Sequence, residues 1–345
     1  MKIKKTIICK GITDYKLNRK INKIYMPKAG DVAVFKVVEL GKHTSLQGEN
    51  GNNSYIFPGD YVMAAFGNRY ATDQFEGYVP TQYHKEYHVL GKGGAIGVLA
   101  SMHTKLEEKG TTNLKLVGYV VDPKNNNKVL NTKYKDAQKI KFNPEAKRPY
   151  KIILSLGSAM DSGKTTTAAF LARGLQDAKK KVAYIKLTGT VYTKDRHYVR
   201  DCGAQLAIDF STFGFPSTYM CSRQEMLDLH ETLLKKAATI NPDYVIIEIA
   251  DGLLQRETAM LLKNHNFMKQ IDEVIFSAAD SLGILSGLHL LKQHGIKPFA
   301  VSGLFTASPL LIEEVEGVIN YPVLTLEGLA SKDVLKKLKN KRKAA

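Results

Sequence analysis

Residues 157–166 constrain the fold of this chain most, and their sequence is GSAMDSGKTT. The short apolar run 151–156 precedes them and predicts a buried strand, whereas 165–175 has one apolar face and predicts a helix. A strand, a tight glycine loop and a helix N-terminus together aim backbone N–H groups at one point. We therefore predict that this segment is a phosphate-binding loop, or P-loop.

The side chains of this loop have separate expected roles. Lys164 would reach the β- and γ-phosphates of a nucleotide as a point charge, and the hydroxyl of Thr165 would ligate Mg²⁺. The rest of the expected phosphate-binding set is Ser158, Asp161, Ser162, Gly163 and Thr166.

Length and composition favour a two-domain protein that lies in the cytoplasm. The chain has 345 residues, of which 44% are hydrophobic, so it is longer than one average domain and can bury sizeable cores. It contains no run of 18 apolar residues and no signal-peptide pattern at its start, which predicts a soluble protein without a membrane partner. Its three cysteines have irregular spacing, so neither a disulfide framework nor a zinc site is expected.

A polar segment with two prolines, 143–149, marks the expected domain boundary. It divides the chain into a basic β-rich domain, 1–147, and a P-loop domain, 148–345, which ends in a basic helix or tail. In the first domain, β-like runs separated by Gly, Asn and Pro predict a small barrel or sandwich. These runs are 32–40, 54–57, 61–66 and 115–121.

From residue 151 onward, apolar strands alternate with amphipathic helices. This pattern predicts an α/β fold, a P-loop NTPase parallel sheet with helices on both faces. The expected strands are 151–156, 182–187, 243–249, 272–277, 297–302 and 322–326. The expected helices are 165–178, 224–240, 281–294, 308–316 and 329–342.

Two of these strands end in charged residues suited to phosphate chemistry. Strand 243–249 carries Glu248, which we expect to hold Mg²⁺ directly or through water, with Asp251 as a second candidate ligand. Strand 182–187 carries Lys186, which would neutralise a substrate carboxylate or the transferring phosphoryl group. Lys164, Lys186 and Glu248 are thus the expected catalytic residues.

The charged segment 192–202 that follows is expected to be a long loop that contacts ligand. Lys194, Arg196 and Arg200 would meet phosphate, and the acids Asp195, Asp201 and Asp209 are candidate metal ligands or bases.

Three motifs of the first half have ordinary structural explanations beside functional ones. The polar segment 67–77 is either a functional loop or a surface loop, and the glycine-rich segment 91–97 either cradles an anion or makes a tight turn. His84 and His88, four residues apart, suit a metal site on a helix, although no third ligand is evident.

Charge is distributed unevenly along the chain. The formal net charge is +17. Residues 1–150 hold 25 Lys and Arg against 13 Asp and Glu, and residues 151–345 hold 25 against 20. An excess of this kind attracts nucleic acid or acidic metabolites, although lysines without interleaved aromatics also suit a plain solvated surface.

In the second half, three motifs in this order resemble dethiobiotin synthetase and its relatives among the P-loop NTPases. Gly157 and Gly163 have the spacing of that family's loop, Lys186 is similar to the lysine that ends its second strand, and 248–253 is similar to its Glu-Gly-Ala-Gly-Gly-Leu motif. The resemblance covers about 151–325 and implies Mg²⁺ at Thr165 and Glu248, nucleotide phosphates at Lys164 and a homodimer.

This chain also departs from the family pattern. Ser158 and Ala159 replace a Thr and an Asp, and Leu187 replaces a Pro. The position that often carries an adenine-reading Asn is Ser302.

Two functions remain open from the sequence. The first is an ATP- and Mg²⁺-dependent enzyme that transfers phosphate to, or ligates, a small acidic metabolite. The second is a nucleic-acid-associated ATPase or polynucleotide kinase that uses the basic first domain. A GTP-binding motif of the Asn/Thr-Lys-x-Asp type is not evident, which favours ATP.

Overall fold

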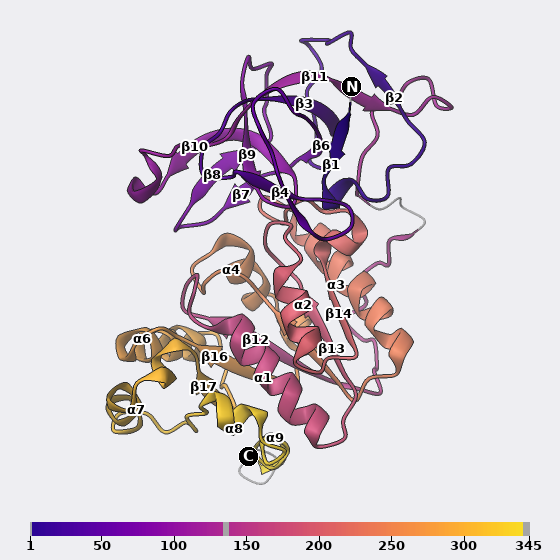
Figure 1. The fold of residues 1–345 in the computed structure, drawn as a ribbon. Coiled ribbons are helices and arrows are strands. Elements are labelled where there is room, and N and C mark those ends of the chain that lie inside the picture. The colour runs from indigo at the N-terminus through magenta and orange to yellow at the C-terminus, as the bar shows by residue number, and fades with distance from the viewer. Residues whose placement is uncertain (1, 134–137, 341–345) are drawn as a thin grey trace. The chain divides into compact units, whose positions relative to one another are not determined.

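The computed structural model describes residues 2–133 and 138–340, and these fall into two compact units. The first unit, here the β-rich unit, consists of Met1–Gln138, Gly189–Thr193 and Phe210–Met220. The second, here the P-loop unit, consists of Lys139–Thr188, Lys194–Asp209 and Cys221–Ala345. Figure 1 follows the chain from the first unit, in indigo and purple, to the second, in pink to yellow.

A parallel sheet forms the centre of the P-loop unit. Its strands lie in the order β14-β13-β15-β12-β16-β17, and every pairing between them is parallel. Their bounds are β12 Lys151–Gly157, β13 Val182–Lys186, β14 Leu206–Asp209, β15 Tyr244–Glu248, β16 Glu273–Ser277 and β17 Ala300–Ser302.

Helices flank this sheet, so the predicted α/β class is confirmed. Apolar residues of α1, α2, α8 and α9 share one core with the strands, and α3 packs against β13 and β14. The bounds are α1 Lys164–Asp177, α2 Lys194–Asp201, α3 Arg223–Ala237, α4 Arg256–Leu262, α5 His265–Met268, α6 Ser281–Gln293, α7 Pro309–Glu316, α8 Leu326–Ala330 and α9 Val334–Asn340.

Register places three charged or polar strand ends side by side. Glu248, the last residue of β15, pairs with Ser155 of β12 on one side and with Lys186 of β13 on the other. Lys186 in turn pairs with Asp209 of β14. The carboxyl ends of parallel strands meet at one edge of a sheet, which is where such folds bind ligands.

Several predictions for this half are wrong in detail. The expected strand 322–326 is absent, because Val323 forms only an isolated bridge with Val301 and α8 begins at Leu326. The sixth strand is instead β14, which was not predicted because it is short and has polar residues on both sides. The segment 192–202 is helical over α2 rather than a loop. The expected helix 329–342 divides at Ser331 into α8 and α9, and the end of the basic tail, 341–343, lies outside the described residues.

The β-rich unit contains a closed ring of strands. β6 pairs with β3, β3 with β11, β11 with β9, β9 with β10, and β10 pairs back with β6. Closing a sheet in this way satisfies the backbone groups at its edges. The bounds are β1 Ile3–Lys5, β2 Lys16–Asn18, β3 Val32–Glu39, β4 Ser45–Gln47, β5 Asn53–Tyr55, β6 Tyr61–Phe66, β7 Arg69–Tyr70, β8 Phe75–Tyr78, β9 Tyr87–Gly91, β10 Ala95–Met102 and β11 Asn113–Val121.

Aromatic side chains fill the interior of this ring. Phe35, Phe66 and Tyr87 are fully buried and meet edge to face, with ring centroids 5.5–5.8 Å apart. Such contacts add to the free energy gained by burying apolar surface. The segment 67–77, expected as a loop, contains β7 and the start of β8, which pair as a hairpin.

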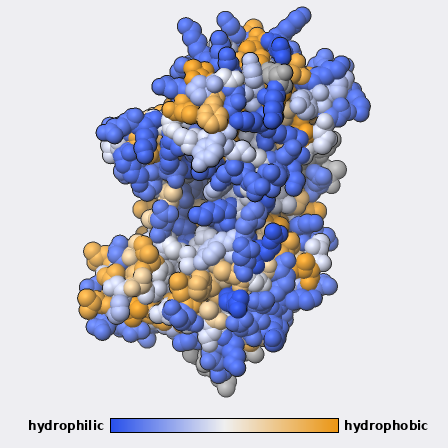
Figure 2. All heavy atoms as spheres, viewed as in Figure 1, coloured by the Kyte–Doolittle hydropathy of each residue, from blue (hydrophilic) through white to orange (hydrophobic). Residues whose placement is uncertain are grey.

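The surface in Figure 2 is mainly hydrophilic over the β-rich unit, and apolar residues gather over α6 and α7 of the P-loop unit. Leu282 and Leu310 on these helices are 72% and 71% exposed. Within the described residues, each helix is too short or too polar to cross a bilayer.

Candidate functional site in the P-loop unit

The predicted P-loop joins the end of β12 to the start of α1. Gly163 is the N-cap of the helix, with φ at 91°, a left-handed conformation that glycine adopts without strain. Asp161 also has a positive φ, 57°, so the loop turns back over itself before the helix begins. Backbone N–H groups at the start of α1 therefore point into the loop, which is the geometry of a phosphate-binding site.

Neighbouring strand ends hold this loop in place. The N–H of Ser158 donates to the carbonyl of Ser277 at 2.9 Å, and the N–H of Leu304 donates to the carbonyl of Ser162 at 3.2 Å. Gly252 lies against the other side, because a Cβ there would come within 2.4 Å of the Ser158 carbonyl oxygen. The loop is thus fixed in shape by the protein itself.

Lys164 lies inside the loop and is 6% exposed. Its Nζ donates to the carbonyl of Ala159 at 2.6 Å and lies 3.3 Å from the Ser162 hydroxyl. Burial lowers the pKa of Lys164, and the charges of Glu248 and Asp251 oppose that shift. The Ala159 carbonyl thus holds the Lys164 ammonium at the place where phosphate oxygens would accept hydrogen bonds from it.

Glu248 is the centre of a buried polar cluster and is 1% exposed. Its Oε1 accepts a hydrogen bond from the hydroxyl of Thr165 at 3.1 Å, and its Oε2 accepts one from the hydroxyl of Tyr184 at 2.7 Å. Oxygen ligands of this kind, a hydroxyl and a carboxylate in contact, suit Mg²⁺. The residues present therefore fit a magnesium ion, although its binding here stays a prediction.

Lys186 completes this cluster. Its Nζ lies 3.0 Å from Oε1 of Glu248 and also contacts the carboxylate of Asp195. Burial alone would lower the pKa of Lys186, but the two carboxylates outweigh burial and raise it above the ordinary value for lysine. The two carboxylates therefore stabilise the charged form of Lys186. We call Thr165, Tyr184, Lys186, Asp195 and Glu248 the acid–lysine cluster.

The other expected residues lie around the loop at different positions. The Thr166 side chain lies close enough to Tyr198 of α2 to act on the pKa of its hydroxyl. Asp251 follows β15 and lies close enough for its charge to act on Lys164. Thr188, which follows Lys186, donates to the carbonyl of Ala250 at 2.6 Å and so ties the ends of β13 and β15 together.

Two members of the acid–lysine cluster were missed or left unassigned from the sequence. Tyr184 was missed, although it lies two residues before Lys186 on the same strand and thus on the same face. Asp195 was expected only as one of three loop acids, and the helical conformation of α2 brings it to Lys186. Arg196, expected to meet phosphate, instead pairs with Asp209 at 3.4 Å.

Ser302 and His88, two other residues singled out in the sequence, lie in surroundings that differ from those expected. The hydroxyl of Ser302 donates to the carbonyl of Leu324 at 2.7 Å and is fully buried, so it is committed within the protein. His88 lies in strand β9, not on a helix, and its Nδ1 accepts from the N–H of Leu99 at 3.0 Å. Among the residues that the structure describes, no group of three or more His, Cys, Asp or Glu side chains is arranged to hold a metal.

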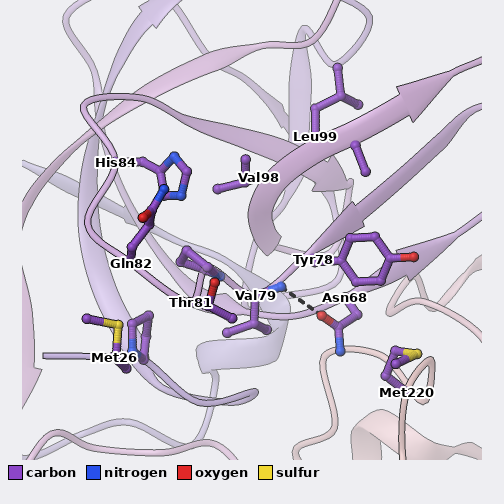
Figure 3. Close-up of a pocket in the computed structure, with 13 residues that line it drawn as sticks. Met26, Asn68, Tyr78, Val79, Thr81, Gln82, His84, Val98, Leu99 and Met220 are labelled. Atoms are coloured by element: carbon purple, nitrogen blue, oxygen red, sulfur yellow. Dashed lines mark hydrogen bonds between the residues drawn. The ribbon is translucent and has the colours of Figure 1, made fainter.

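A hollow of about 740 Å³ lies within the β-rich unit and was not expected from the sequence. Figure 3 shows Val79, Val98 and Leu99 on its walls, with Met26 and Met220 at its margin. The amide of Asn68, which also lines it, is already engaged, since its Oδ1 accepts from the N–H of Val79 at 2.7 Å.

Comparisons with known proteins add little beyond this geometry. No protein-family model matches the chain, and no curated protein matches it. Among solved structures, it is similar to the signal recognition particle receptor FtsY from Elizabethkingia anophelis, with 18% identity over 56% of each chain and a TM-score of 0.33. This chain thus spans just over half the length of that protein.

Two further FtsY structures match to a similar degree. The chloroplast FtsY of Physcomitrella patens has 17% identity over 57% of this chain and 67% of its own, with a TM-score of 0.38. FtsY from Mycoplasma mycoides has 16% identity over 58% and 68%, with a TM-score of 0.34. TM-scores this low carry no argument about function, so the assignment of a P-loop nucleotide-binding protein is based on the geometry above. The resemblance to dethiobiotin synthetase stays a prediction.

Proposed function

We propose that this protein is a Mg²⁺- and ATP-dependent P-loop enzyme that transfers a phosphoryl group to, or ligates, a small acidic metabolite. The observation that carries the proposal is the contact between Thr165 of the P-loop and Glu248, with the Lys186 ammonium bound to the same carboxylate. A site that only bound nucleotide would not need a second buried lysine beside the acid.

Each residue has a separate part in this scheme. Lys164 and the N–H groups at the start of α1 bind and orient the phosphates. Thr165 and Glu248 hold Mg²⁺, which supplies charge neutralisation when it is bound. Lys186 adds a fixed positive charge where negative charge accumulates during transfer, and Asp195 and Tyr184 hold it and Glu248 in position.

The choice of ATP follows from the lack of a sequence motif that reads guanine. We also propose that the protein forms a homodimer and lies in the cytoplasm. Dethiobiotin synthetase-like chemistry is one form that the reaction can take, since that family also acts on small carboxylic acids.

The test is nucleotide turnover by the full-length protein with Mg²⁺. ATP and GTP are compared, first alone and then with a panel of small carboxylic acids. We expect one acid to stimulate ATP turnover, with phosphate transferred or released in proportion to the acid consumed. Lys164→Ala should reduce turnover by roughly 10²–10³-fold, whereas the matched surface variant Lys181→Ala should not change it.

A second candidate, a nucleic-acid-associated ATPase or polynucleotide kinase, is favoured by the charge of residues 1–150. Single-stranded DNA and RNA at two salt concentrations are therefore included in the same assay. Stimulation by nucleic acid that falls steeply with salt would replace the first proposal with the second. Turnover unchanged in Lys164→Ala would contradict both.

A further inference from the structure

The hollow in the β-rich unit is a feature that the proposed function does not use. Its volume of about 740 Å³ lies within the range of roughly 300–1,000 Å³ that is typical of small-molecule pockets. All of the residues that line it belong to the β-rich unit, and most come from three stretches of the chain. These stretches are 26–27, 78–84 and 98–100.

Asp31 fixes the first of these stretches. Its carboxylate accepts a hydrogen bond from the hydroxyl of Tyr25 at 2.6 Å and another from the N–H of Lys28 at 2.8 Å. These two contacts lie on either side of Met26 and Pro27 in the chain, so the part of the loop that lines the hollow is held at both ends.

Hydrogen bonds also fix the other two stretches. The side-chain amide of Asn68 accepts from the N–H of Val79 at 2.7 Å and donates to the carbonyl of Tyr219 at 3.2 Å. The N–H of Leu99 donates to Nδ1 of His88 at 3.0 Å. Walls that the protein holds in this way are formed before a ligand arrives, so binding does not have to order them at an entropic cost.

The inner wall of the hollow is apolar. Val79 and Val98 are half-buried and pack against the hydrophobic core of the β-rich unit. At the margin, Met26 and Met220 are 40% and 49% exposed. An apolar group placed here would remove apolar surface from water, and methionine sulfur makes favourable contacts with aromatic rings. A ligand with a ring as its apolar body therefore suits this wall.

The lining lacks the charge that is abundant elsewhere in the chain. Among the described residues that line the hollow there is no Lys, Arg, Asp or Glu, although these four types make up 24% of the sequence. A carboxylate or phosphate brought against this lining would lose hydration without gaining a fixed counter-ion. The lining therefore favours an uncharged ligand.

Three polar side chains of the lining have unused hydrogen-bonding capacity, those of Thr81, Gln82 and His84. None of the three makes a side-chain hydrogen bond to another described residue, in contrast to Asn68. Figure 3 shows Gln82 and His84 together at one end of the hollow. A hydroxyl, a carboxamide and a neutral imidazole can each both donate and accept. The complement to such groups is a ligand edge that carries a donor and an acceptor.

We propose that this hollow binds an uncharged ring compound with adjacent N–H and C=O groups at one edge, as in aryl carboxamides and nucleobases. The ring covers the wall formed by Val79 and Val98, and the polar edge pairs with Gln82 and His84. This inference concerns the β-rich unit alone and stands whether or not the proposed function is correct.

The experiment measures binding to the full-length protein by calorimetry at about 0.15 M salt, where long-range attraction of anions to a basic protein is largely screened. Nicotinamide is compared with nicotinate, and uracil with orotate, since the second member of each pair carries a negative charge. We expect nicotinamide or uracil to bind at least about tenfold more tightly than its charged counterpart. The neutral compound that binds identifies the source of the polar edge.

Variants assign the binding to the hollow. Ala100→Phe adds a ring at an exposed lining position and should weaken binding of the neutral compound by at least about tenfold. Ser54→Phe, at an exposed strand position outside the hollow, should not weaken it. Only the binding that Ala100→Phe removes is assigned to the hollow, which separates it from any binding of these compounds in the P-loop unit.

A second variant tests the polar edge. Gln82→Leu keeps the approximate size of the side chain and should weaken binding by about three- to tenfold, the effect of one hydrogen bond. Thr72→Val, a polar-to-apolar change at an exposed position outside the lining, is the control. Circular dichroism checks the folding of each variant. Because Gln82 is exposed, Gln82→Leu keeps the test valid if Ala100→Phe does not fold.

Three results would overturn the proposal. One is the absence of binding by both nicotinamide and uracil. Another is binding of these compounds that is unchanged in Ala100→Phe and in Gln82→Leu. The third is binding of nicotinate or orotate in the hollow as tight as that of its neutral counterpart, because the site would then recognise an anion.

Discussion

In the P-loop unit, the buried ammonium of Lys186 contacts two carboxylates, whereas in the β-rich unit the charges of Arg69, Lys105 and Lys92 act on Lys42 against that of Asp73. The pKa of Lys186 is accordingly raised and that of Lys42 is lowered. The first site carries its own counter-ions and is stable before a ligand binds. At Lys42 the charges that act on the ammonium are mostly positive, and they add to the effect of burial.

The largest expected effect comes from breaking the balance in the acid–lysine cluster. Glu248→Gln keeps the shape of the side chain but removes one of the two negative charges beside Lys186. Breaking a buried ion pair by changing one partner typically lowers the free energy of unfolding by about 3 kcal/mol or more. Denaturant unfolding would measure the change.

Two controls sharpen this result. Adding Lys186→Met to Glu248→Gln should recover part of the lost stability, because position 186 then no longer carries a buried cation that lacks one of its counter-ions. Glu49→Gln removes an exposed partner of Lys5 in the β-rich unit and should cost about 0.5 kcal/mol or less. Equal losses of unfolding free energy for Glu248→Gln and Glu49→Gln would contradict the expected difference between the buried and the exposed ion pair.

A smaller effect is expected where the P-loop backbone meets Gly252. Gly252→Ala would place a Cβ 2.4 Å from the Ser158 carbonyl oxygen, so the loop must shift. Overpacking of this kind costs roughly 1–3 kcal/mol, and nucleotide affinity should fall with it. Gly328→Ala, where the nearest atom would be 3.6 Å away, is the matched control. Unchanged nucleotide affinity in Gly252→Ala would show that the loop does not need this support.

The smallest effect is the pH dependence of stability at Lys42. Its pKa is about 8 in the folded protein and 10.5 ordinarily, so between these values the unfolded chain keeps a proton that the folded chain has lost. The free energy of unfolding should therefore rise with pH in this window, and Lys42→Gln should lack that contribution. Urea unfolding at pH about 7.5 and about 9.5 compares the native protein, Lys42→Gln and the control Lys115→Gln. A pH dependence identical in all three would contradict the lowered pKa of Lys42.

Local sequence was sufficient for much of the P-loop unit. The segment 157–166 carries its glycines, lysine and threonines in one stretch, so strand, loop and helix could be placed from it directly. Glu248 and Lys186 were also placed at the ends of their strands in advance, and a charged residue at such a position indicates the ligand edge of a parallel sheet. Whether these residues act as proposed is a matter for the variants above.

Only the tertiary structure decided the remaining partners. The short strand β14 is polar at its ends, and α2 is so highly charged that the same residues suit a loop, so packing against the sheet was needed to fix both. The charges of Arg69 and Lys92 act on Lys42, although the three residues come from separate segments of the β-rich unit. Periodicity reports only neighbours along one element, whereas contacts between distant segments depend on which strands pair, and that pairing is determined by the fold as a whole.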